Sequence, residues 1–154
     1  MDDAPVRLQR TATVRVPKSR LFSVIACEPD EWGYWCPGFT TASRWTTSGP
    51  PGVGSTRTMR AFGTDFPETV LAFDQDARFT FRIDKCAAPM VKAFVEDWTF
   101  ESVDENPSPA TRITWSMAAH SALPDVLAGP FFKGFQSFLM RGAVERLQQR
   151  YGNS

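Results

Sequence analysis

Residues 124–151, PDVLAGPFFKGFQSFLMRGAVERLQQRY, are the stretch that decides the fold. Its large apolar side chains recur with helical spacing and fall within an arc of roughly 120°. They are Phe131, Phe132, Phe135, Phe138 and Leu139. Polar residues occupy the opposite side. We therefore predict one long amphipathic helix whose aromatic stripe faces the rest of the molecule.

The chain before this helix is typical of strands. Alternating apolar and polar residues from Val6 to Val16 predict a half-buried strand. Further strands are expected at 39–47, 55–61, 65–73, 78–84, 92–103 and 111–119. Short connections, such as Phe62-Gly63 and 87–89, indicate antiparallel neighbours. Pro17 suits the first turn of a short helix, and residues 28–38 form a second short helix or a packed loop.

Length and charge narrow the class of protein. The 154 residues predict a single domain spanning 1–154, large enough to bury a core with room for a ligand. The formal net charge is zero, which argues against nucleic acid and anionic membranes as partners. The acidic first residues contain no apolar run, so we expect no signal peptide, no membrane insertion and a cytoplasmic location. A homodimer remains an open alternative to a monomer.

Few residues are suited to binding a metal. Cys27, Cys36 and Cys86 are odd in number and lack C-x-x-C spacing, and His120 is the single histidine. A zinc site or a Cys-His nucleophile pair needs more such groups in a closer arrangement. We predict ordinary free thiols, no metal and no cofactor.

Several short motifs, in order along the chain, resemble one superfamily. They are VPKSRLF at 16–22, EWGYWCP at 31–37, VGSTR at 53–57, ETV at 68–70 and TRITW at 111–115. Together they resemble the START-like, birch-pollen-allergen-like superfamily known as SRPBCC, and in particular its polyketide cyclase/dehydrase-like branch. The resemblance implies an α+β helix-grip fold. In this fold a curved antiparallel sheet of about seven strands wraps around a long C-terminal helix, and two short helices follow the first strand.

The resemblance also implies a deep apolar cavity between the sheet and the last helix. Members of the superfamily use it for lipid transfer, ligand sensing, or the cyclisation and dehydration of polyketide chains. A cavity of about 300 Å³ or more would suit a flat hydrophobic ligand. The pattern of residues alone favours a filled core, because inward aromatic side chains usually pack against one another, and it is the resemblance that favours a cavity.

Strand alternation and the helix stripe give the candidate ligand-binding residues. They are Met59, Phe66, Val70, Phe79, Phe81, Phe94, Trp98, Trp115, Met117, Phe131, Phe135 and Phe138. Trp35 is added because it follows Tyr34 in the segment that the superfamily uses as a cavity rim. There it either gates entry or packs in the core.

Three charged residues are the candidate catalytic groups. If Phe62-Gly63 is a two-residue turn, Arg57 lies opposite Glu68 and both point inward. The pair is either a structural ion pair, or a site where Arg57 holds a ligand oxygen while Glu68 orients it or moves a proton. Glu96 falls between inward-facing residues, where burial would raise its pKa, unless a bulge turns it outward.

We predict from these features a protein that binds a hydrophobic small molecule, lipid or polyketide-like, with cyclase or dehydratase activity left open. The alternative is a regulatory or partner-binding protein without catalysis. That protein would use the outer face of the sheet. The residues expected on this outer face are Thr58, Arg60, Thr80, Arg82, Asp84 and Arg112.

Overall fold

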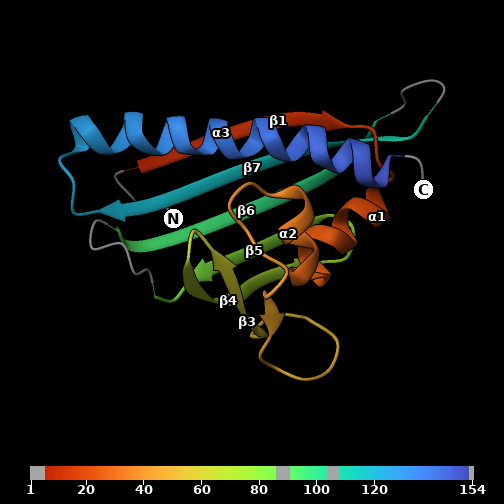
Figure 1. The fold of residues 1–154 in the computed structure, drawn as a ribbon, viewed down its shortest axis with the longest axis horizontal. Helices are drawn as coiled ribbons and strands as arrows, with labels where there is room; N and C mark the ends of the chain where they lie inside the picture. Colours follow the sequence, from red (N-terminus) through yellow and green to blue (C-terminus); the bar gives the residue numbers. More distant parts are fainter. Residues whose placement is uncertain (1–5, 86–90, 104–107, 153–154) are drawn as a thin grey trace.

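A computed structural model describes residues 6–85, 91–103 and 108–152 (Figure 1). Within them, seven strands form one antiparallel sheet in the order β1-β7-β6-β5-β4-β3-β2. The strands are β1 (Val6–Val14), β2 (Arg44–Trp45), β3 (Thr56–Ala61), β4 (Thr64–Asp74), β5 (Arg78–Ile83), β6 (Val91–Val103) and β7 (Ala110–Ser121). This is the predicted helix-grip architecture.

The helices lie on one side of the sheet. They are α1 (Lys18–Phe22), continued by a π-helical turn at Ser23–Cys27, a 3₁₀ turn at Pro29–Glu31, α2 (Trp32–Trp35) and α3 (Asp125–Tyr151). Helix α3 packs against β1 and α2, while α1 and α2 cover the sheet near the C-terminal end of α3 (Figure 1). None of the described helices combines the length and the apolar character needed to cross a membrane.

The strand predicted at 39–47 is mostly a turn. Only Arg44–Trp45 pairs with β3, and Phe39 makes an isolated bridge to Ala61. Between them the Thr40 side chain accepts a hydrogen bond from the Ala42 amide, and Ser43 Oγ donates to the Thr40 carbonyl. Such local bonds compete with a strand ladder. The other predicted strands agree within two residues, while residues 1–5, Cys86 and the connection at 87–89 lie outside the described residues.

Helix α3 has the predicted length, but it is rotated relative to the predicted stripe. Its buried residues are Ala128, Phe132, Gln136, Leu139, Met140, Ala143, Leu147 and Tyr151. Phe131 and Phe138 are instead 52% and 60% exposed. The polar Gln136 lies on the buried face because its side-chain amide donates to the carbonyl of Trp115 at 3.1 Å. Small residues on the same face let the helix approach the sheet closely.

Gly142 allows α3 to pack against the segment that follows α2. A methyl group at this position would lie 2.6 Å from Cγ of Pro37, whereas one at Gly134, on the same helix, would meet no atom within 4 Å. We therefore expect Gly142→Ala to lower the free energy of unfolding by about 1–3 kcal/mol. Gly134→Ala is the matched control and is expected to raise it by about 0.5–1 kcal/mol through helix propensity alone.

Urea unfolding of both variants measures this difference. Equal stabilisation by the two substitutions would show that the contact between α3 and Pro37 is not tight.

Candidate functional site

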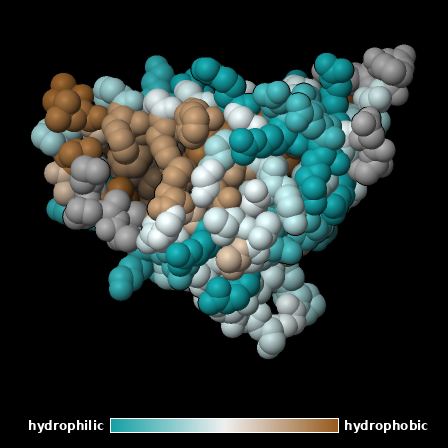
Figure 2. All heavy atoms as spheres, in the orientation of Figure 1, coloured by the Kyte–Doolittle hydropathy of each residue, from teal (hydrophilic) through white to brown (hydrophobic). Residues whose placement is uncertain are grey.

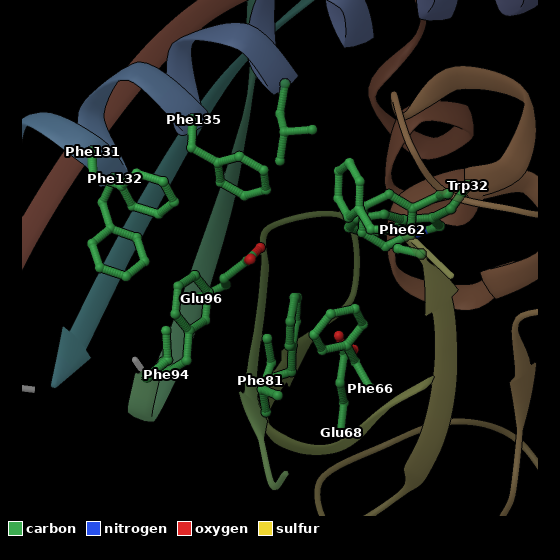
Figure 3. Close-up of a pocket in the computed structure, with 15 residues that line it drawn as sticks. Trp32, Phe62, Phe66, Glu68, Phe81, Phe94, Glu96, Phe131, Phe132 and Phe135 are labelled. Carbon is green, nitrogen blue, oxygen red and sulfur yellow. The ribbon is translucent and has the colours of Figure 1, made fainter. Parts of the chain in front are cut away.

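A cavity of about 200 Å³ lies between the sheet and the first half of α3 (Figure 3). Its wall contains nine aromatic side chains and two carboxyl groups. The lining residues are Trp32, Phe39, Ala61, Phe62, Phe66, Glu68, Phe81, Ile83, Val91, Phe94, Glu96, Phe131, Phe132, Phe135 and Leu139. The cavity is smaller than the sequence led us to expect, so it fits a small ring system better than a long chain.

Part of the predicted ligand-binding set lines this cavity. The residues that do so are Phe66, Phe81, Phe94, Phe131 and Phe135. Another group is buried in the core away from the cavity wall: Trp35, Met59, Val70, Phe79, Trp98, Trp115 and Met117. Phe138 was wrongly placed, because the rotation of α3 turns it into a surface groove beside Pro37 and Arg141.

The core residues miss the cavity because aromatic side chains fill that part of the interior. Trp35 is fully buried, with its ring 4.5 Å from that of Trp32 and 6.4 Å from that of Trp98. Trp35 therefore packs in the core and does not gate the cavity. The lining residue from this segment is Trp32, whose indole Nε1 donates to the carbonyl of Ile25 at 2.9 Å.

The hairpin tip between β3 and β4 forms one wall that the sequence prediction missed. Phe62 and Gly63 have φ angles of 51° and 75°, and the strand register follows the predicted two-residue turn. The ring of Phe62 lies 5.7 Å from that of Phe135 on α3 and 6.4 Å from that of Phe39. A large aromatic residue at a turn position that favours Asn or Gly was the available signal.

The predicted pairing of Arg57 with Glu68 is confirmed. Arg57 Nε donates to Glu68 Oε2 at 2.7 Å, and both side chains are buried. Arg57 Nη1 donates to the carbonyl of Ile25 at 3.3 Å. Four rings surround the guanidinium, at 5.1 Å for Trp32, 5.8 Å for Trp45, 4.9 Å for Phe79 and 4.8 Å for Phe81.

Glu68 lines the cavity, whereas Arg57 lies behind it, away from the wall. Burial raises the pKa of Glu68 to about 7, although the charge and the hydrogen bond of Arg57 lower it. Among the described residues, Arg57 Nη2 has no hydrogen-bond partner. Arg57 therefore acts on the cavity through Glu68 rather than by touching a ligand there.

Glu96 points inward, as predicted, and regular pairing of β6 with β5 and β7 excludes the outward bulge. Its Oε2 accepts hydrogen bonds from the indoles of Trp98 at 3.2 Å and Trp115 at 3.0 Å, and these two rings are stacked. Desolvation raises the pKa of Glu96 to about 8, and the nearby charge of Glu68 adds to this. The protonated acid therefore predominates at neutral pH.

The two carboxyl groups face one space. Glu68 on β4 and Glu96 on β6 flank β5, and Figure 3 shows both pointing toward the space that Phe135 bounds from α3. A carboxyl group in such an apolar place accepts or donates a hydrogen bond more strongly than it would in water. The arrangement is able to hold one polar group of an otherwise apolar ligand, or to exchange a proton with it.

Apolar surface gathers at the cavity rather than on the outer face of the sheet. Phe62 is 52% exposed, and Val126 and Leu127 are exposed near Phe131 at the start of α3. Figure 2 shows the corresponding hydrophobic area beside a hollow. On the outer face of the sheet, arginines form ion pairs with acidic neighbours: Arg60 with Asp65, Arg82 with Asp84, and Arg112 with Glu101. That face is a hydrated polar surface.

No cluster of three or more metal-binding side chains occurs among residues 6–85, 91–103 and 108–152. Cys27 and Cys36 are free thiols, and burial raises the pKa of both, which reduces their reactivity at neutral pH.

Comparisons with known proteins agree with this architecture. Residues 5–152 match the model of the family described as polyketide cyclase/dehydrase and lipid transport. A search of curated proteins by sequence found no match.

Similar solved structures support the same fold. The major latex-like protein 151 of Panax ginseng superposes with a TM-score of 0.75 at 14% identity, covering 94% of this chain and 96% of the other. A START superfamily protein of Mycobacterium smegmatis gives 0.72 at 13% identity, covering 96% and 97%. The protein XoxI of Bacillus cereus gives 0.70 at 16% identity, covering 95% of each chain. With its match over nearly the whole length, the chain belongs to the polyketide cyclase/dehydrase and lipid transport family.

Proposed function

We propose that the protein binds one small hydrophobic molecule, polyketide-like or lipid-like, in the cavity between the sheet and α3. The observation that carries this proposal is an apolar cavity to which the described residues contribute nine aromatic side chains and two carboxyl groups. Such rings favour flat, conjugated ligands. The family description, which combines polyketide chemistry with lipid transport, supports the same ligand class.

The carboxyl groups orient the ligand. Most of its surface is expected to contact Phe side chains, while a single hydroxyl, carbonyl or amine group reaches Glu96 or Glu68. Binding that buries this group without a partner would cost free energy, so ligands that carry a suitably placed polar group are favoured.

A ligand-binding experiment tests the proposal. We expect 2-naphthylmethanol, which has two fused rings and one hydroxyl group, to bind in isothermal titration calorimetry. Ala61 lines the cavity on β3, so Ala61→Phe places a ring inside it and is expected to weaken binding by at least about tenfold, or 1.4 kcal/mol. Leu71→Phe, an exposed substitution on β4, is the control and should bind like the wild type.

Equal binding by wild type and Ala61→Phe would place the ligand elsewhere. Unfolding midpoints of both variants establish that a loss of binding is not a loss of folded protein.

Acid–base catalysis is the second candidate function, and one observation favours it. The carboxyl of Glu96, with its pKa raised to about 8, faces the same cavity and carries a proton at neutral pH. Such a group is able to protonate a carbonyl or a departing hydroxyl of a polyketide-like ligand. Glu68, held by Arg57, would position that ligand. Recovery of every bound ligand chemically unchanged would leave binding as the function.

A further inference from the structure

We infer that the cavity selects ligands by charge: it takes a hydrophobic amine, bound as the ammonium ion against Glu96, in preference to a carboxylate of the same shape. This inference rests on the proposed function, since it concerns the ligand of the same cavity. The reason is that Arg57 is already paired with Glu68, whereas the carboxyl group of Glu96 has no cation beside it among the described residues.

Among the described residues, the cation beside the cavity is Arg57, which is engaged through Nε and Nη1 and keeps only the buried Nη2 without a partner. Arg57 donates to Glu68 at 2.7 Å, its Nη1 bonds to a backbone carbonyl, and its guanidinium lies behind the wall among aromatic rings. Arg57 itself does not line the cavity, so a ligand carboxylate placed there gains no direct contact with the guanidinium. The other lining residues, as the structure describes them, include no lysine, arginine or histidine. An anionic ligand therefore finds no free cation in the wall.

Glu96 has no cation as a partner. Its two hydrogen bonds come from neutral indole groups, and both end on Oε2. Among the described residues, Oε1 accepts no hydrogen bond. An ammonium group at Oε1 would supply the opposite charge that this buried carboxylate lacks, and charge-assisted hydrogen bonds of this kind are among the strong ones.

The aromatic wall favours the same sign of charge. Ring faces carry partial negative charge, so they attract cations and repel anions. The protein already uses this property, because Trp32 and Phe81 contact the guanidinium of Arg57 and also line the cavity. An ammonium near Glu96 would lie among rings of the same kind, as Figure 3 shows for Phe81, Phe94 and Phe135.

Binding of an ammonium ion is coupled to the proton of Glu96. The charged or titratable groups that act on this carboxyl are Glu68 on β4, Arg57 on β3 and the buried thiol of Cys36 after α2. The ammonium stabilises the carboxylate, so the proton leaves Glu96 for the solvent when the ligand binds. Affinity is therefore expected to rise with pH up to about 8, where Glu96 is half ionised without ligand.

Three matched probes test the inference: 2-naphthylmethylamine, 2-naphthylmethanol and 2-naphthoate share their rings and differ in the polar group. At pH 8 we expect the amine to bind at least about tenfold more tightly than the alcohol, and the carboxylate to bind more weakly than both. Titration of the amine at pH 7, in two buffers of different ionisation enthalpy, should show release of close to one proton, because Glu96 is mostly protonated there without ligand.

Glu96→Gln is the test variant and is expected to lower the amine-to-alcohol affinity ratio by at least about tenfold. Glu101→Gln, an exposed change on the same strand, is the control and should keep the ratio.

If the alcohol binds but the amine gains nothing or the carboxylate binds best, the inference is overturned while the proposed function stands. If none of the probes binds, both fail. If Glu96→Gln does not fold, the proton release by the wild type decides the question.

Discussion

Replacing Arg57 with methionine is expected to lower the free energy of unfolding by about 3–5 kcal/mol at pH 8. The substitution leaves Glu68 buried without its cation, and methionine cannot replace the hydrogen bond to the carbonyl of Ile25. An unpaired buried charge is more costly than the absence of both charges. Urea unfolding, followed by tryptophan fluorescence, measures the loss.

The double variant Arg57→Met/Glu68→Leu is the matched control. It removes both charges, so it is expected to recover most of the stability lost in the single variant. The single variant should also lose less at pH 5 than at pH 8, because Glu68 is neutralised by protonation at the lower pH. Equal instability of the single and double variants would assign the loss to packing around the guanidinium.

This expectation affects how Arg57 variants are interpreted. The side chain is fully buried and lies outside the cavity wall, so its loss disturbs the fold before it disturbs any ligand contact. Reduced binding or turnover in such a variant therefore reports on function only when the folded fraction is measured at the same time.

The wild-type protein is expected to lose stability as pH rises from about 5 to 8, and Glu96→Gln is expected to lose less. The pKa of Glu96 is about 8 in the folded protein against an ordinary value of 4.5. Between these values the folded state binds more protons than the unfolded state. The contribution of Glu96 to stability is then complete below about pH 4.5 and falls with a slope approaching 1.4 kcal/mol per pH unit until about pH 8.

Unfolding free energies of wild type and Glu96→Gln at several pH values give the contribution of Glu96 as the difference between the two curves. Glu68, whose pKa is raised to about 7, contributes a slope of the same sign in both proteins, so the difference between the curves reports Glu96 together with its coupling to Glu68. Glu101→Gln, at an exposed site, should follow the wild type. Parallel curves for wild type and Glu96→Gln would mean that burial does not shift the titration of Glu96.

The sequence predicted the fold well because its strongest signals are local. Alternation located the strands, and the turn at Phe62-Gly63 determined the register that brings Arg57 opposite Glu68. The same alternation placed Glu96 on the inner face. These signals depend on the geometry of neighbouring residues, which a sequence displays directly.

The cavity wall was harder to predict because alternation tells which way a side chain points, not whether a neighbour fills the space in front of it. Trp98 and Trp115 point inward, but they stack on each other and hold Glu96. Their roles depend on where α1 and α2 pack on the sheet. This packing is a tertiary contact, which strand alternation does not reveal. The rotation of α3 was likewise hidden, since a phenylalanine stripe and a small-residue stripe overlap in its sequence, and Gln136 joins the buried one.

The hairpin tip has a consequence for how the protein can change over evolution. Phe62 holds a left-handed backbone conformation that costs a non-glycine residue about 1–2 kcal/mol, yet its ring is half-exposed and touches Phe135 across the cavity. This side chain bounds the cavity but is not one that the buried core requires. Replacement of this one residue is therefore expected to change the shape of the cavity, and so which molecules fit it, while the packed interior and its charged pair stay as they are.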